Sequence, residues 1–360
     1  MKPQKIKIAG RNRNLDEVIE GIIVLDDLIQ ENNHSLRRAW STWLPDRDWE
    51  ESKDGIGRMS YNPIVSMRKS YPENFEGRLI DSPYFIFILN QARESRPTSD
   101  GKDKEQPEKT ETKEEKKSHC ALCKNVIGKK MVISNIDDYY LTPNGYPYHM
   151  GASLLINKSD KVKQGDISAE NIASWMKASI LLDQYVFYNT IGAGASIKEH
   201  QHAQVVDLKE MKIENRLVQL PILNSYFVGR EKINGDVFRL KNYPVDALIF
   251  KGSDAPHKAS YAANLLKKDG RAFNVLVNGD EVYLVGRNPQ NEVSICILRK
   301  VGGYEISGVA LLGNIEEKIE DGVKVPGPKI FTNMTYDTFW KNVHRAGSSL
   351  EELAKKFGGK

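Results

Sequence analysis

The chain has 360 residues, a length that suffices for two domains of ordinary size or for one large double domain. With 40% hydrophobic and 28% charged residues, the composition is that of a globular protein and excludes a disordered or fibrous one. The formal net charge of +4 is too small to indicate nucleic-acid binding, and none is expected. Because no apolar run is long enough for a membrane span or a secretory signal, we expect a cytoplasmic protein with no membrane partner.

The first third of the chain contains few regular patterns. Residues 15–33 place apolar side chains at helical spacing and predict an amphipathic helix within an N-terminal extension, residues 1–80. The apolar segment 82–90 predicts a buried strand. Residues 98–118 contain no large apolar side chain and many Lys, Glu and Thr, so they cannot bury enough surface to order themselves. We expect this segment to be a flexible insertion.

Strand and helix patterns alternate in the remainder of the chain. YYLTP and ASLLIN predict strands, and a helical stretch follows Ser168, which is a favourable N-cap residue. A further strand, VFYN, leads into a glycine-containing loop and the apolar strand AQVV. From about residue 210 the sequence alternates strand patterns with one helix near residues 258–267. A mixed, largely antiparallel α+β fold is therefore predicted.

The segment His200-Gln201-His202-Ala203-Gln204 is the most informative pattern in the sequence. In a strand, residues two apart point to the same face, so His200, His202 and Gln204 are predicted to form one polar row. A neutral imidazole is a good nucleophile near pH 7 and a good leaving group, which suits the transfer of a nucleotidyl group. We assign this role to His202. The alternative is a polar strand face turned to solvent.

Gln204 and the preceding loop provide groups that can hold a phosphate. The Gln204 amide donates hydrogen bonds without titrating, so it can stabilise a phosphoryl oxygen in the transition state. The loop that starts at Asn189 contains Gly194 and Ser196, and it can bring backbone N–H groups close to a phosphate. Taken alone, this loop is equally consistent with a tight turn between a helix and a strand.

Two of the three cysteines form a Cys-x-x-Cys motif, Cys120 and Cys123. In a reducing compartment this spacing indicates metal or redox chemistry before a structural disulfide. The alternative is a pair of reduced cysteines in a turn beside the insertion.

Three separate motifs resemble the galactose-1-phosphate uridylyltransferase and diadenosine tetraphosphate phosphorylase branch of the histidine-triad superfamily. They are NTIGAGASIKEHQHAQ, ILNQARESRPT and HCALC. The resemblance implies an α+β fold of two related halves, each with a mainly antiparallel sheet and packed helices. The catalytic half would span residues 81–209 and the degenerate second half residues 210–345, followed by a C-terminal tail at 346–360.

The resemblance also implies roles for particular residues. His202 would be the nucleotidylated histidine, and Arg93 and Arg96 would contact substrate phosphates. The residues Cys120, Cys123 and His200 would hold a structural Zn²⁺. In relatives, histidines occupy the positions of Ala152 and Asp160, so the fourth ligand is open, with the Asp160 carboxylate as a candidate.

The predicted function is that of a nucleotidyltransferase or phosphorylase with a covalent nucleotidyl-histidine intermediate. Its substrate would be a nucleoside diphosphate sugar or a dinucleoside polyphosphate, and its acceptor phosphate or a sugar 1-phosphate. Two alternatives are a nucleotide-binding protein without turnover and a nucleotide hydrolase. The base, the acceptor and the oligomeric state, including a homodimer, stay open.

Overall fold

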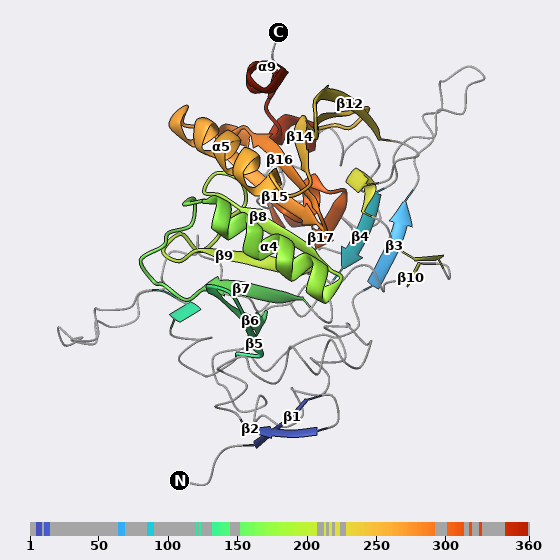
Figure 1. Ribbon diagram of the computed structural model, residues 1–360. Helices are drawn as coiled ribbons and strands as arrows, with labels where there is room; N and C mark the ends of the chain where they lie inside the picture. The colour runs from blue at the N-terminus through green and yellow to red at the C-terminus, as the bar shows by residue number, and fades with distance from the viewer. Residues whose placement is uncertain are drawn as a thin grey trace, which may run out of the picture.

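Figure 1 shows the computed structural model of the chain. The structure describes residues 132–144, 152–206, 220–223, 228–291, 301–312 and 343–358, together with Cys120, Leu122, Cys123 and several short strands outside these ranges. The predicted helix at 15–33, the insertion at 98–118 and both Arg93 and Arg96 lie outside the described residues. No helix among those described is both long and apolar enough to cross a membrane.

A ten-stranded sheet forms the centre of the molecule. Its strands follow the spatial order β12-β13-β14-β16-β15-β8-β9-β7-β6-β5, and each neighbouring pair is antiparallel. The predicted α+β class with a largely antiparallel sheet is thus confirmed. The strand bounds are β5 (Ser134–Ile136), β6 (Tyr139–Pro143), β7 (Ser153–Asn157), β8 (Tyr185–Asn189), β9 (His202–Val206), β12 (Gly229–Asn234), β13 (Val237–Lys241), β14 (Ala247–Lys251), β15 (Ala272–Asn278) and β16 (Glu281–Arg287).

Two helices of equal length, α4 (Ala169–Leu182) and α5 (Ala255–Lys268), pack against each other over one face of this sheet (Figure 1). Ser168 is the N-cap of α4, as predicted, and its hydroxyl accepts a hydrogen bond from the Asn171 N–H at 3.2 Å. The fully buried Trp175 of α4 stacks on Tyr188 of the sheet, with ring centroids 4.6 Å apart. The helices therefore cover the main hydrophobic core.

Alternation along the central strands separates the core from the opposite face. In β8, Val186 and Tyr188 belong to the core under the helices, so Phe187 and Asn189 face the other way. On the same principle β9 directs Ala203 and Val205 into that core. The first residue of β9, His202, therefore projects from the face of the sheet away from α4 and α5.

The chain builds the two sides of the sheet in the same order. On one side it runs through β5, β6, β7, α4, β8 and β9, and on the other through β12, β13, β14, α5, β15 and β16. The two sides meet where β8 pairs with β15, with Asn189 opposite Asn274. Counted outward from this seam, the strands on one side are β8, β9, β7, β6 and β5, and those on the other side are β15, β16, β14, β13 and β12. Each side thus has its fourth strand in the chain at the seam, followed by its fifth, third, second and first.

Smaller elements connect distant parts of the sequence. The predicted strand at 82–90 is present as β4 (Phe85–Leu89), which pairs with β3 (Ile64–Arg68) and, in parallel, with β17 (Val309–Leu312). The residues predicted as a C-terminal tail include a helix, α9 (Glu351–Gly358), whose Leu353 and Ala354 are buried in the core. The remaining elements are β1 (Lys5–Ile8), β2 (Arg11–Asn14), β10 (Lys212–Ile213), β11 (Arg216–Leu217), β18 (Glu317–Lys318), β19 (Lys324–Val325), α6 (Gly303–Ile306), η4 (Pro221–Leu223) and η5 (Pro289–Asn291).

Candidate active site and metal centre

The orientation of the His202 imidazole is fixed by a backbone group two residues earlier. His202 is 8% exposed, and its Nδ1 lies 3.0 Å from the carbonyl oxygen of His200. A carbonyl oxygen only accepts hydrogen bonds, so Nδ1 carries the proton and donates it. When the ring is neutral, this tautomer has its lone pair on Nε2. The geometry thus selects the nitrogen that can act as a nucleophile.

Gln204 shares the face of β9 with His202, as predicted from the strand alternation. Its side chain is partly buried, and its Oε1 is buried without a hydrogen-bond partner among the described residues. The strand begins at His202, so His200 lies in the bend before it and does not share the alternation of β9. The predicted polar row is therefore reduced to two residues, because the chain turns at His200 to reach a different set of neighbours.

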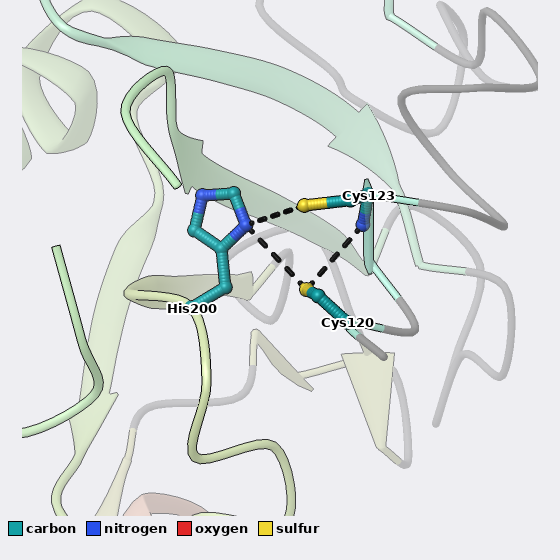
Figure 2. A group of neighbouring side chains, drawn as sticks. All are labelled: Cys120, Cys123 and His200. Atoms are coloured by element: carbon teal, nitrogen blue, oxygen red, sulfur yellow. Dashed lines mark hydrogen bonds between the residues drawn. The ribbon is translucent and has the colours of Figure 1, made fainter. Parts of the chain in front are cut away.

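Those neighbours are Cys120 and Cys123 (Figure 2). The Nδ1 of His200 lies 3.5 Å from the Sγ of Cys120 and 3.1 Å from the Sγ of Cys123, and all three potential ligand atoms lie within 4.8 Å of one another. The His200 Nε2 donates to the Asn157 carbonyl at 2.6 Å, so Nδ1 is the nitrogen that a neutral His200 ring would present to a metal. The cluster could hold a metal ion, and the sequence-predicted ligands Cys120, Cys123 and His200 are brought together.

The donor set and its spacing fit zinc. Bond lengths of about 2.3 Å to sulfur and about 2.1 Å to nitrogen at a tetrahedral ion separate the ligand atoms by roughly 3.6–3.8 Å. The distances from the His200 Nδ1 to the two Sγ atoms are slightly shorter than this, so a small outward movement of the thiols would accommodate the ion. The hydrogen bond from His200 to the Asn157 carbonyl is of the kind that orients metal-bound imidazoles.

The two thiols differ in acidity in the metal-free cluster. Burial opposes the ionisation of Cys120, but hydrogen bonds from His200 and from the Cys123 backbone outweigh it and hold the Cys120 pKa below its ordinary value. Burial and the neighbouring Cys120 raise the pKa of Cys123 to about 11. In the metal-free cluster the Cys120 thiolate therefore lies beside His200, whose own pKa is raised because its hydrogen bonds to Cys120 and to the Asn157 carbonyl outweigh its burial. Binding of a cation would displace the proton between Cys120 and His200 as well as the proton of Cys123.

Asp160 lies close to this cluster but outside it. Its negative charge contributes to the raised pKa of Cys123, after burial and the effects of Cys120. Its side chain is exposed, however, and its carboxylate is not among the three ligand atoms that lie within 4.8 Å of one another. A ligand role for Asp160 stays a prediction.

The loop after β8 is held by the other side of the sheet. The Asn189 Oδ1 accepts hydrogen bonds from the Asn274 side chain at 2.7 Å and from the Gly303 N–H at 2.9 Å. The Asn274 amide also donates to the Ala193 carbonyl at 2.8 Å. The fully buried Arg287 in turn donates a hydrogen bond from its Nη1 to the Asn274 Oδ1 at 2.5 Å. Asn189 therefore helps to fix the loop through its oxygen.

The loop glycines are required by close packing against neighbouring residues. Gly192 and Gly194 have φ angles of +81° and +97°, a region that favours glycine. A Cβ at Gly194 would lie 2.6 Å from the Cα of Gly302, and one at Gly192 would lie 2.9 Å from the Cβ of Pro289. Ser196, at the end of the loop, is partly buried. This packing gives a structural reason for both glycines, and the predicted contact of the loop with a phosphate stays a prediction.

We expect Gly194→Ala to destabilise the protein more than a matched glycine substitution. Gly252 also has a positive φ, +81°, but a Cβ there would meet only the Asp236 Oδ2 at 3.8 Å. Both alanines incur backbone strain of about 1–2 kcal/mol. Only Gly194→Ala adds a steric overlap, which costs about 1–3 kcal/mol more. Urea denaturation of both variants measures this difference, and equal free energies of unfolding would contradict the packing argument.

Two residues that touch the site were not found from the sequence. Gln164 hydrogen-bonds the backbone of both His202 and Asn189, and Asn274 holds the loop as described. The only signal for Asn274 is a polar residue within the apolar run AFNVLVN. Gln164 lies in a polar connecting segment and has no such signal.

The same fold occurs in crystal structures of yeast Ap4A phosphorylase. The match to one such structure has a TM-score of 0.51 at 12% sequence identity and covers 81% of this chain and 89% of that one. The match to the complex with Ap4A has a TM-score of 0.50 at 13% identity and covers 81% and 92%. These matches confirm the predicted resemblance to the uridylyltransferase and phosphorylase branch at the level of fold. No family model matches the sequence, and neither does any curated protein.

Proposed function

We propose that the protein is a nucleotidyl-transferring phosphorylase that acts on dinucleoside polyphosphates, with His202 as the nucleophile. The observation that carries this proposal is the hydrogen bond from the His202 Nδ1 to the His200 carbonyl, which places the lone pair on Nε2. The fold of a phosphorylase whose crystal structure contains Ap4A supports the substrate class over a nucleoside diphosphate sugar.

The reaction would consist of two displacements at one phosphorus atom. In the first, the Nε2 lone pair of His202 attacks the α-phosphorus, a P–N bond forms, and the bond from phosphorus to the bridging oxygen breaks with release of the remaining nucleoside polyphosphate. In the second, an oxygen of inorganic phosphate attacks the same phosphorus and the imidazole leaves in its neutral form. With Ap4A and phosphate, these steps give ATP and ADP.

Neighbouring residues would stabilise the charge that develops on the phosphoryl oxygens. The Gln204 amide shares the face of β9 with His202, and it can donate to a phosphoryl oxygen without titrating. Ser196 and the backbone at Gly194 are the proposed phosphate contacts from the loop. Arg93 and Arg96 keep their proposed role in binding substrate phosphates, for which guanidinium groups are well suited.

The metal of the cluster would be structural zinc. Bound through the His200 Nδ1 and the sulfurs of Cys120 and Cys123, it would supply a fixed cross-link and no chemistry at the substrate. Its consequence for catalysis would be indirect, since the carbonyl that orients His202 belongs to His200. Asp160 is the proposed fourth ligand.

We also propose that the two sides of the sheet are related halves and that only one of them carries a nucleophile. The matching order of strands and helices around the β8–β15 seam supports this relation. In that order β16 corresponds to β9, and it carries Glu281, Tyr283 and Val285 on the face where β9 carries His202 and Gln204. The second half would then support the site, as Asn274 supports the loop at Asn189.

Substrate assays with and without inorganic phosphate would test this function. We expect the protein to convert Ap4A to ATP and ADP only when phosphate is present, with nucleoside diphosphate sugars as poorer substrates. Formation of AMP and ATP without phosphate would instead identify a hydrolase. Binding of Ap4A without any product would support a nucleotide-binding protein that lacks turnover, and either result would refute the phosphorylase assignment.

A further inference from the structure

The β8–β9 ladder ends just before the proposed nucleophile. Its pairs run from Tyr185 opposite Val206 to Phe187 opposite Gln204. Two residues further in the same register, Asn189 would lie opposite His202 and their backbones would exchange hydrogen bonds. These bonds are made to the side chain of Gln164 instead.

The Gln164 amide is inserted between the two strand ends and uses both of its functional groups. Its Oε1 accepts from the His202 N–H at 2.8 Å, and its Nε2 donates to the Asn189 carbonyl at 2.6 Å and to the His202 carbonyl at 3.1 Å. The side chain is 3% exposed, so little water can replace it. Only a side chain with a donor and an acceptor at one end can satisfy these three backbone groups.

The segment that carries Gln164 is itself fixed to the His200 region. The Gln164 N–H donates to the Lys198 carbonyl at 3.2 Å, and the Gln201 N–H donates to the Val162 carbonyl at 2.9 Å. The Gln164 amide is thus held by the same stretch of chain that precedes His202. It cannot move without disturbing the backbone on both sides of the imidazole.

We infer that Gln164 is a positioning residue that sets the His202 ring and the Asn189 loop in register with each other. This inference rests on the proposed function for its catalytic consequence. Holding the backbone of His202 fixes where its Nε2 lies, and holding the Asn189 carbonyl fixes the start of the loop proposed to contact phosphate. Because a shift of about 1 Å in a reacting group can cost about 10²-fold in rate, the bridge should act on the chemical step.

The test compares Gln164→Met and Gln164→Glu with a matched control, Gln184→Met. Methionine keeps the length but removes both polar groups, whereas glutamate keeps an acceptor and places oxygen against two carbonyls. Gln184, which immediately precedes β8, is equally buried, and its Oε1 has no hydrogen-bond partner among the described residues. Single-turnover incubation with Ap4A, without phosphate, measures the rate and the amplitude of protein adenylylation separately.

For Gln164→Met we expect an adenylylation rate about 10²-fold lower than wild type at saturating Ap4A, with the Kd for AMP nearly unchanged. Gln164→Glu should be no faster, and Gln184→Met should match wild type. A purely structural role would lower the amplitude in proportion to unfolded protein and leave the rate of the folded fraction unchanged. That result, or a wild-type rate in Gln164→Met, would overturn the inference.

A second measurement separates this inference from the proposed function. In ¹⁵N-labelled protein, the Nδ1–H signal of His202 is assigned by its loss in His202→Ala. We expect Gln164→Met to shift or broaden that signal while Gln184→Met leaves it unchanged. If wild type shows no adenylylation, the proposed function fails, and the NMR result alone decides whether Gln164 positions the ring. An unchanged signal in Gln164→Met would refute it.

Discussion

Replacing His202 with alanine or asparagine should abolish phosphorolysis of Ap4A, with a fall in kcat of roughly 10³-fold or more, because the step that forms the P–N bond loses its nucleophile. The substitutions should leave the fold intact, since the backbone of His202 keeps its bonds to Gln164. Steady-state assay of ATP formation measures the loss. Both variants should also fail to acquire covalent nucleotide.

An exposed histidine on another element provides the control for this result. His257 is exposed on α5, and His257→Ala should retain wild-type activity and labelling. Residual turnover of His202→Ala at wild-type rate would show that the phosphorus is attacked directly by the acceptor. In that case the His202 tautomer that the His200 carbonyl selects would have no role in catalysis.

Among the predicted changes, loss of the metal should have the second largest effect. It should lower the stability of the folded protein and, as a consequence, its activity. Cys120→Ser and Cys123→Ser each remove one of the three ligands that the structure brings together, so we expect less than stoichiometric zinc and a lower Tm. A ligand present at about a thousand times its Kd stabilises the folded state by about 4 kcal/mol, which sets the scale of the loss. Elemental analysis and thermal denaturation measure the two effects.

The remaining cysteine distinguishes metal loss from loss of any thiol. Cys296 is outside the Cys-x-x-Cys motif, so Cys296→Ser should keep its full complement of zinc. Prolonged treatment of wild-type protein with a chelator should reproduce the lower Tm of the cysteine variants, and added zinc should reverse it. A purified wild-type protein without stoichiometric zinc, and with a Tm insensitive to chelator, would exclude the proposed metal.

Local patterns in the sequence were sufficient to predict much of the sheet. Apolar runs identified β8, β14, β15 and β16, because these strands are buried on both faces and need β-branched and aromatic residues throughout. Ser168 predicted the start of α4 because an N-cap acts within one helical turn. The Cys-x-x-Cys motif predicted a ligand pair on the same grounds, since its two residues are close in any turn.

Long-range contacts could not be read from local patterns. The pairing of β8 with β15 joins residues more than 80 positions apart, and no periodicity specifies which strand is the neighbour. Asn274 therefore looks like an interruption of an apolar strand until its contact with Asn189 is known. Gln164 was missed for the same reason, because the backbone groups that it hydrogen-bonds lie at the ends of two different strands.

The glycine loop illustrates how one residue type supports two interpretations. A positive φ at Gly192 and Gly194 is compatible both with a phosphate-binding turn and with close packing of backbone. The packing of Gly194 on Gly302 is a tertiary contact between residues 108 positions apart, and the sequence gives no indication of it. The sequence located the glycines of this loop, whereas their packing contacts required the structure, and the predicted phosphate contact stays a prediction.

The most direct test of the central claim is to locate the nucleotide on the wild-type protein. After a single turnover with Ap4A in the absence of phosphate, peptide mass mapping should place one AMP group on the peptide that contains His202. A bond between phosphorus and an imidazole nitrogen should be labile in acid and stable in base, and added phosphate should release the group as ADP. AMP attached to a different residue, or ATP released without any attached AMP, would contradict the account.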